Sequence, residues 1–245
     1  MKAVGIIPAR FGSTRFPGKP LAMIAGKTMI ERVCENARRA ASLSEILVAT
    51  DDERIFSCVR SFGGRAVMTS PECGSGTDRI AEAAAGTDAD VVLNIQGDEP
   101  MIDHAALDLL VSLFEKDPEL RLGTLVTPVK NEEELNNPNV VKVVMGENDV
   151  CLYFSRSPIP YLREMAFMDF SFWRHIGIYG FRKEFLSEFG RLPRGRLEQA
   201  ESLEQLRALE NGVTIKAARI SDWKGVSVDV PGDIRVVEEI MKKGG

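Results

Sequence analysis

Short apolar runs alternate with amphipathic helical patterns over the first hundred residues, and this alternation restricts the chain to a small set of folds. We predict strands at four apolar runs, 4–7, 46–49, 66–68 and 91–95, the first of them of the buried type. We predict helices between them at 28–40, 52–62 and 77–85. Thr28 is a typical N-cap, and Gly63 with Gly64 is a typical helix stop. Strands alternating with helices favour an α/β fold whose parallel sheet is covered on both faces.

The second half is richer in strands. We predict strands at 122–129, 140–145, 151–154, 173–181, 214–220 and 226–228. One helix is expected at 198–211, with three leucines, Leu203, Leu206 and Leu209, facing inward. A last helix is expected at 231–242, with Pro231 at or near its first turn. This half should form a mixed sheet that serves as a lid or subdomain over the first half. The alternative is a chain of two domains with a boundary near Asn131.

Composition and charge argue against several classes of protein. The formal net charge of −5 lacks the basic surplus of a nucleic-acid binder. No segment approaches the roughly 20 apolar residues of a membrane span, and the N-terminal apolar run is too short for a signal peptide. Four scattered cysteines indicate free thiols in a reducing cytoplasm. With only two histidines, His104 and His175, a zinc site is not expected, so any metal should be magnesium held by carboxylates.

The segment after the first predicted strand combines cations with glycines. Arg10, Arg15 and Lys19 stand close to Gly12 and Gly18, just beyond the strand end. Glycine lets backbone N–H groups approach a triphosphate, and the cations can neutralise its oxygens. The spacing does not fit a Walker loop, because five residues separate the glycines and Pro20 follows the lysine. Since ligands of parallel sheets bind beyond the carboxyl ends of the strands, this loop predicts a nucleotide site.

Two further loops leave the same predicted sheet edge. Asp98, after the strand 91–95, could hold magnesium against a phosphate, or it could simply be a turn residue. The loop 69–79 carries hydroxyls and glycines at a helix N-terminus, which suits hydrogen bonding to a base or ribose. Helix capping by Ser75 or Thr77 is the structural alternative, and capping is compatible with binding.

Motifs along the whole chain together resemble those of the 3-deoxy-manno-octulosonate (Kdo) cytidylyltransferases, the CMP-Kdo synthetases. The matching stretches, in family order, are residues 7–10, 13–15, 17–21, 48–51, 75–79, 96–100, 153–156, 175–180, 203–207 and 228–231. The resemblance implies a three-layer nucleotide-diphospho-sugar-transferase-like α/β fold, with a mostly parallel central sheet and a smaller β-rich subdomain. It also implies one nucleotidyltransferase domain over 1–245, with a nucleotide-binding half at 1–130 and a sugar-binding and dimerisation half at 131–245.

The resemblance also implies residue roles. It assigns nucleotide binding to Ala9, Arg10, Arg15, Lys19, Thr69, Ser75, Arg79, Gln96 and Asp98. It assigns contacts with the sugar acid to Gln96, Arg156, His175, Tyr179, Glu204 and Gln205. It makes Lys19, Arg10, Asp98 and Asp229 catalytic, with a magnesium ion between the two aspartates. Considered without the resemblance, Asp229 could instead cap the last helix, His175 could be a core residue, and Glu204 could be a solvated helix residue.

The implied reaction is CMP transfer from CTP to Kdo for lipopolysaccharide biosynthesis, by a cytoplasmic homodimer that uses Mg²⁺. Its partners would be CTP and an acidic sugar, without nucleic acid or membrane. One alternative acceptor is a related acidic sugar, such as 8-amino-Kdo or sialic acid. A sugar-1-phosphate nucleotidyltransferase would share the N-terminal loop but use UTP, GTP or dTTP. A non-catalytic nucleotide-binding regulator is the third alternative, and the presence of both Asp98 and Asp229 argues against it.

Overall fold

A computed structural model describes residues 1–12 and 16–243, which form two compact units. The first unit contains residues 1–111 together with the C-terminal segment from 224 onward, and the second contains 112–223. This grouping differs from the expected division at 130/131, because the C-terminal segment packs with the N-terminal part of the chain. Helix α4 (His104–Lys116) carries the chain from the first unit into the second.

A parallel sheet lies at the centre of the first unit. Its strands are β1 (Ala3–Ala9), β4 (Leu43–Thr50), β5 (Arg65–Met68) and β6 (Val91–Asn94), in the order β6-β1-β4-β5. All pairs are parallel, and β1 is central, with Ile6 beside both Leu47 and Asn94. Ile6 and Ile7 point to opposite faces of β1, yet neither is exposed to solvent. Burial on both faces is typical of an inner strand of a parallel sheet between helices. The four predicted strands are confirmed, and the edge strand β5 is partly exposed.

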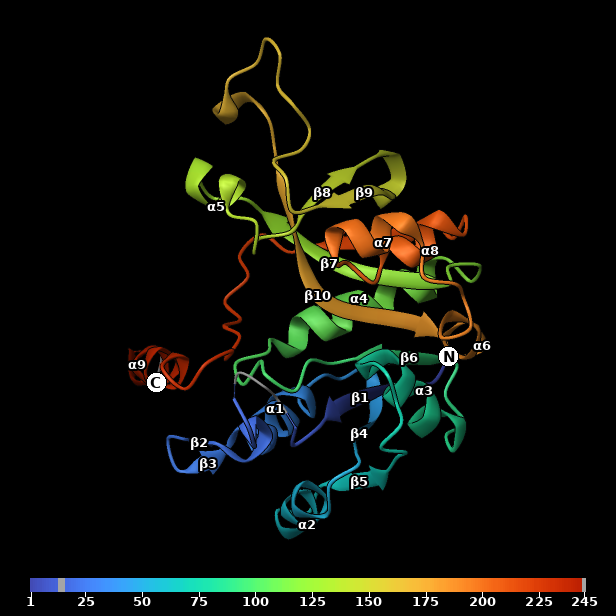
Figure 1. Ribbon diagram of the computed structural model, residues 1–245, viewed down its shortest axis with the longest axis vertical. Helices are drawn as coiled ribbons and strands as arrows, with labels where there is room; N and C mark the ends of the chain where they lie inside the picture. Colours follow the sequence, from blue (N-terminus) through green and yellow to red (C-terminus); the bar gives the residue numbers. More distant parts are fainter. Residues whose placement is uncertain (13–15, 244–245) are drawn as a thin grey trace. The chain divides into compact units, whose positions relative to one another are not determined.

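Three helices connect these strands. They are α1 (Met29–Ala37), α2 (Glu53–Ser61) and α3 (Gly76–Ala85). Right-handed crossovers place α1 and α2 on one face of the sheet and α3 on the other, which gives three layers. Figure 1 shows α2 beside the edge strand β5. The predicted N-cap Thr28 accepts a hydrogen bond from the Glu31 N–H at 3.3 Å, and the predicted stop Gly63 has a φ of 74°.

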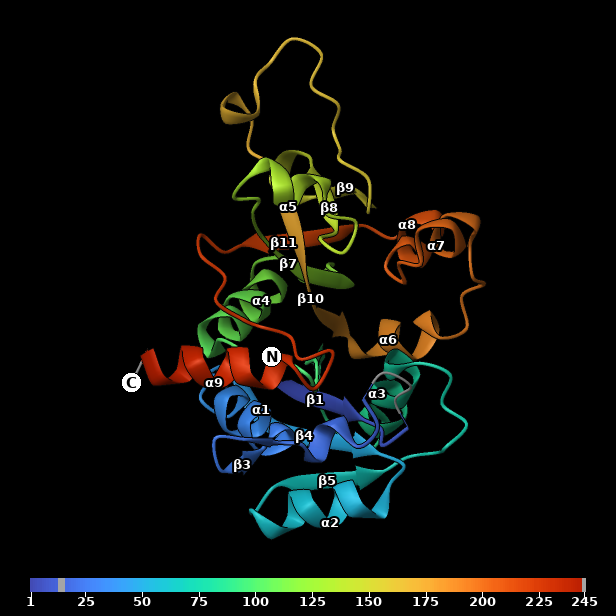
Figure 2. The ribbon, with the colours of Figure 1, turned by 60° about the vertical axis from the view of Figure 1, so that its left-hand side comes forward.

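The C-terminal segment departs from the prediction. Residues 226–228 form no strand, and the last helix, α9 (Asp233–Lys243), begins two residues after Pro231. The Val228 side chain is instead buried in a cluster with Ile24, Met29 and Val237. Helix α9, drawn in red in Figure 2, contacts β2 of the hairpin β2–β3 (Met23–Ile24 and Lys27–Thr28). Apolar residues at 226 and 228 suggested a strand, but burial of the Val228 side chain accounts for this pattern without sheet pairing.

The second unit contains a mixed sheet. Its strands are β7 (Leu122–Pro128), β8 (Lys142–Met145), β9 (Cys151–Ser155), β10 (Trp173–Arg182) and β11 (Ile215–Arg219). Strand β7 pairs antiparallel with β10 and parallel with β11, while β8 pairs antiparallel with both β9 and β10. Short helices not predicted from the sequence are α5 (Glu132–Asn136) and α6 (Lys183–Phe189). The prediction of a strand-rich, mixed second part is therefore confirmed, and the fold is α/β.

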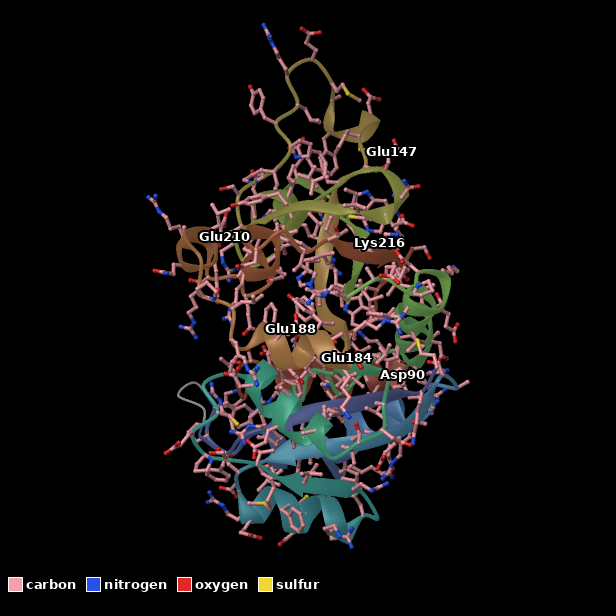
Figure 3. All side chains as sticks on the ribbon, turned by 90° about the vertical axis from the view of Figure 1, so that its right-hand side faces the viewer. Asp90, Glu147, Glu184, Glu188, Glu210 and Lys216 are labelled. Carbon is pink, nitrogen blue, oxygen red and sulfur yellow. The ribbon has the colours of Figure 1, made fainter. Side chains whose placement is uncertain are left out.

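The single helix predicted at 198–211 is wrong. Two helices occupy the segment, α7 (Arg196–Glu201) and α8 (Leu206–Glu210), separated where Ser202 adopts a left-handed φ of 52°. The Glu210 carboxylate, labelled in Figure 3, accepts hydrogen bonds from the N–H groups of Leu197 and Glu198 at 3.0 and 3.2 Å. Glu210 thus caps the first turn of α7, and this contact requires a reversal of the chain that a continuous helix would not allow.

Candidate active site

A pocket in the first unit collects three of the loops singled out from the sequence. Its volume is about 340 Å³. It is lined by residues that follow β1, β5 and β6 and by the C-terminal segment: Pro8, Ala9, Arg10, Lys19, Pro20, Cys73, Gly74, Ser75, Gly76, Arg79, Gln96, Gly97, Asp98 and Asp229. The loops meet because the carboxyl ends of parallel strands lie along one edge of the sheet. Residues of the predicted nucleotide-binding loops thus line one pocket, whereas Arg15 lies outside the described residues.

Lys19 forms ion pairs with both of the predicted metal-binding aspartates. Its ammonium nitrogen lies 2.8 Å from Asp98 Oδ2 and 3.9 Å from Asp229 Oδ1. It also donates a hydrogen bond to the Val228 carbonyl at 3.0 Å. Two nearby carboxylates would otherwise repel each other, so the lysine charge stabilises their approach. The structure thus brings together Asp98 and Asp229, which are far apart in sequence.

The backbone of the Asp98 turn fixes the position of the C-terminal segment. The Val228 N–H donates to the Asp98 carbonyl at 2.9 Å. Ser227 donates through its hydroxyl to the Glu99 carboxylate at 3.3 Å. Asp229 therefore reaches the pocket from a segment without regular secondary structure, and not from the strand end that we predicted.

Glu99 follows Asp98 without lining the pocket, and the sequence analysis gave it no role. Its side chain is buried, and its second carboxylate oxygen has no hydrogen-bond partner among the described residues. Burial, with the neighbouring charge of Asp98, raises the pKa of Glu99 to about 7. The signal available in the sequence was an acidic pair directly after a buried strand, but the sequence does not show which carboxylate points inward.

The N-terminus of α3 forms another wall of the pocket. Ser75 is its N-cap and accepts a hydrogen bond from the Asp78 N–H at 3.0 Å, so the capping alternative is confirmed. Helix N-termini favour anions, because their first N–H groups and the helix dipole both point toward the ligand. Gly74 and Gly76 flank the cap and also line the pocket. Capping and phosphate binding are thus compatible at this position.

Arg79 extends from α3 into the same wall. Its guanidinium donates to the Thr69 hydroxyl and, at 2.8 Å, to Asp51 Oδ2. The arginine is buried, so these two partners fix its orientation. Thr69 contacts Arg79 and does not line the pocket itself. Direct binding of nucleotide by Thr69 stays a prediction, and Asp51 is an orienting residue that was not predicted.

The oxygen donors at the pocket suit magnesium. Carboxylates are preferred ligands of Mg²⁺, which commonly takes one or two from the protein and completes its shell with water and substrate phosphates. Asp98 and Asp229 supply such a pair beside one wall of the pocket. No group of three or more His, Cys, Asp or Glu side chains that could hold a metal occurs within 1–12 and 16–243. The donor set therefore fits a cation that the protein shares with a triphosphate, and not an all-protein metal cage.

The predicted sugar-binding residues His175 and Tyr179 lie on β10 in the second unit. Their ring centroids are 5.2 Å apart, and the His175 ring also packs edge-on against Phe154. Two extra residues bulge between Ile176 and Tyr179, which leaves the alternation of side chains unchanged. The two rings therefore share one face of the strand, as predicted from their spacing.

Burial keeps His175 neutral. The Thr124 hydroxyl contacts His175 Nε2 at 2.9 Å and the Ile178 carbonyl at 2.8 Å. When the hydroxyl donates to that carbonyl, its oxygen accepts from the imidazole N–H. Burial lowers the pKa of His175 to about 3, because the charged imidazolium would lose its hydration there.

The protein should become less stable below neutral pH because of His175. Its unfolded pKa is 6.5 and its folded pKa is about 3, so only the unfolded state takes up this proton between those values. The contribution of neutral His175 to the free energy of unfolding is complete above pH 6.5 and is lost as the pH falls toward 3. Between pH 7.5 and 5.5, His175 should account for about 1.4 kcal/mol of lost stability. Urea unfolding at both pH values measures the loss of unfolding free energy. This loss should be about 1.4 kcal/mol smaller in His175→Asn than in the wild type. An identical loss in the two proteins would contradict the prediction.

The other predicted sugar-binding residues lie around α7 and α8. The charge of Glu204 contributes, after burial, to raising the pKa of Tyr179, which indicates that the two side chains are close. Gln205 is buried, and its amide nitrogen has no hydrogen-bond partner among the described residues. The Arg156 guanidinium donates to the carbonyls of Glu201, Pro138 and Ser202 at 2.7, 3.0 and 3.4 Å. Contact of these residues with a sugar acid stays a prediction.

Comparison with known proteins decides the family. A family model described as cytidylyltransferase matches residues 4–215. The 3-deoxy-manno-octulosonate cytidylyltransferase of Myxococcus xanthus (strain DK1622) is 50% identical, with 100% of this chain and 98% of the relative covered. The chain belongs to the 3-deoxy-manno-octulosonate cytidylyltransferase family. A second member, from Geotalea daltonii (strain DSM 22248 / JCM 15807 / FRC-32), is 48% identical with both chains fully covered.

A solved structure supports membership of the Kdo cytidylyltransferase family. It is described as CMP:2-keto-3-deoxy-manno-octonic acid synthetase complexed with CTP, and it is 41% identical to this chain. The alignment covers 100% of both chains with a TM-score of 0.95. The resemblance and the nucleotidyltransferase fold inferred from sequence motifs are thus confirmed. Among the described residues, no helix is long and apolar enough to cross a membrane.

Proposed function

We propose that the chain transfers CMP from CTP to Kdo, giving CMP-Kdo and pyrophosphate. The observation that carries the proposal is the placement of Lys19 between Asp98 and Asp229, in a pocket at the carboxyl ends of the strands. The names of the relatives support the reaction, and the CTP complex of a similar protein supports the nucleotide.

The chemistry is an in-line displacement at the α-phosphorus. The anomeric hydroxyl of Kdo attacks, a bond forms between its oxygen and phosphorus, the bond to the β-phosphate oxygen breaks, and the hydroxyl proton passes to solvent. Arg10 and Lys19 oppose the negative charge of the phosphates, and the N-terminus of α3 adds N–H donors. No covalent enzyme intermediate is required, so positioning and charge stabilisation account for the rate enhancement.

We assign the binding of a magnesium ion to Asp98 and Asp229. When bound, Mg²⁺ supplies positive charge that polarises the phosphate and lowers the pKa of a coordinated hydroxyl. Lys19 already contacts both carboxylates, so it holds them at the pocket wall for this purpose.

We assign recognition of the acidic sugar to the predicted residues of the second unit. Gln96, which the resemblance assigns to both substrates, lines the pocket of the first unit. The residues of the second unit are Arg156, His175, Tyr179, Glu204 and Gln205. A neutral His175 beside Tyr179 supplies hydrogen-bonding groups suited to sugar hydroxyls, and Arg156 supplies the positive charge that a sugar carboxylate requires. 8-Amino-Kdo and sialic acid share the carboxylate and are the alternative acceptors.

We further propose a cytoplasmic homodimer that serves lipopolysaccharide biosynthesis. Apolar side chains of the second unit support an interface there, because Tyr161 is 89% exposed and Met168 is 86% exposed. A location in the cytoplasm agrees with the use of CTP and with the four free cysteines. Sedimentation analysis measures the mass directly, and a monomer at micromolar concentration would refute the dimer.

A substrate panel tests the proposed reaction. The protein is incubated with Mg²⁺, one of CTP, UTP, GTP or dTTP, and one of Kdo, 8-amino-Kdo, sialic acid or a sugar 1-phosphate. Mass spectrometry of the products should show CMP-Kdo, with pyrophosphate released in equal amount. Product from a sugar 1-phosphate alone would refute the proposal, and the absence of any turnover with nucleotide bound would favour a regulator.

A further inference from the structure

Asp233 is the first residue of α9, and its carboxylate reaches back to the chain that carries Asp229. One oxygen, Oδ2, accepts hydrogen bonds from the N–H groups of Asp229 at 2.8 Å and Val230 at 3.0 Å. An aspartate carboxylate is ordinarily ionised at neutral pH. Hydrogen bonds to an ionised acceptor are stronger than those between neutral groups.

The backbone of Asp229 has no sheet ladder to hold it. Residues 224–230 form no helix or strand, and the Asp229 side chain is 51% exposed. On one side, the Val228 N–H is bonded to the Asp98 carbonyl. On the other side, the N–H groups of Asp229 and Val230 are bonded to Asp233. The backbone that carries the Asp229 side chain is thus held by one hydrogen bond to the Asp98 carbonyl and by two to the Asp233 carboxylate.

We propose that Asp233 is a positioning residue, which orients Asp229 toward Lys19 and Asp98 by holding the two backbone N–H groups. The inference rests on the proposed function, because it gives Asp229 a role in cation binding. It predicts that loss of Asp233 weakens the use of Mg²⁺ without removing any group that contacts the nucleotide.

Another acidic residue of α9 provides a matched control. Glu238 also accepts a backbone hydrogen bond within the first unit, from the Ala25 N–H at 2.8 Å. That bond attaches α9 to the turn between β2 and β3, away from Asp229. An effect that merely reflects looser attachment of α9 should appear in Glu238→Ala as strongly as in Asp233→Ala.

The experiment compares Asp233→Ala, Asp233→Asn and Glu238→Ala with the wild type. Amide hydrogen exchange by NMR, without ligands, should be about tenfold faster at 229 and 230 in Asp233→Ala. The Mg²⁺ concentration that gives half-maximal pyrophosphate release should also rise about tenfold, while KM for CTP at saturating Mg²⁺ stays near its wild-type value. Asp233→Asn keeps an acceptor oxygen, so both quantities should stay within about threefold of the wild type. Glu238→Ala should leave both unchanged.

Unchanged exchange at 229 and 230 in Asp233→Ala would overturn the proposal. An equal rise in the Mg²⁺ requirement of Glu238→Ala would also overturn it. If Asp233→Asn were as impaired as Asp233→Ala, the effect would come from charge alone, and the proposal would again be wrong. If Asp233→Ala does not fold, Asp233→Glu replaces it, because the extra methylene moves the same carboxylate oxygen. Asp233→Glu should then show the faster exchange at 229 and 230 and the higher Mg²⁺ requirement expected of Asp233→Ala. Amide exchange is measured without turnover, so it tests the positioning role of Asp233 even if the protein does not catalyse the proposed reaction.

Discussion

Asp98→Asn is expected to lower kcat about 10³-fold, a loss of roughly 4 kcal/mol in transition-state stabilisation. The asparagine keeps the size of the side chain but loses the negative charge that binds Mg²⁺. The fold should persist, because the contact with the C-terminal segment is made by the Asp98 backbone carbonyl, which the substitution retains. Pyrophosphate release at saturating CTP, Kdo and Mg²⁺ measures the effect.

Asp222→Asn is the matched control for Asp98→Asn. Asp222 is exposed on the second unit, where it pairs with Lys130 at 3.4 Å. The same change of charge there should leave kcat unaltered, since exposed ion pairs contribute little. A near-normal kcat for Asp98→Asn, with circular dichroism showing a folded protein, would remove Asp98 from the proposed mechanism.

Lys19→Met is expected to lower kcat/KM about 10²- to 10³-fold. Part of the loss should appear in binding, because one charged hydrogen bond to the triphosphate contributes about 1.5–3 kcal/mol. The remainder arises because methionine can no longer neutralise Asp98 and Asp229, which Lys19 contacts at 2.8 and 3.9 Å. Isothermal titration with CTP, without Kdo, separates the binding part from the catalytic part.

Lys27→Met controls for the loss of a positive charge from the first unit. Lys27 lies in β3 and pairs with Glu35 on α1, outside the pocket. Its replacement should leave both CTP affinity and kcat/KM within about twofold of the wild type. Wild-type affinity for CTP in Lys19→Met would show that this lysine does not bind the triphosphate.

Local signals in the sequence were sufficient for the four parallel strands of the first unit and the three helices between them, but helix α4 and the hairpin β2–β3 were not predicted. Apolar periodicity located four strands, and Thr28 and Gly63 marked helix ends because capping and left-handed turns depend on single residue types. The break at Ser202 could not be predicted, because serine carries no preference for a φ of 52°. The apolar residues near 228 were misassigned because burial against α9 and pairing in a sheet both require apolar side chains.

The site was predictable only where strand ends define it. Lys19 and Asp98 both follow strands of one parallel sheet, so their proximity could be inferred from topology. The partner Asp229 came from the family resemblance, since its segment forms no regular element. Glu99, Asp51 and Asp233 were missed, because the direction of a carboxylate depends on tertiary packing that one sequence does not reveal.

We propose that Asp98 and Asp229 jointly hold a divalent cation against the triphosphate of CTP. Anomalous diffraction from crystals grown with CTP and Mn²⁺ tests this most directly, because the metal position is seen without reference to catalysis. We predict an anomalous peak in direct ligand contact with a carboxylate oxygen of each aspartate and with the α-phosphate. A fully occupied triphosphate whose metal contacts neither aspartate would contradict the account.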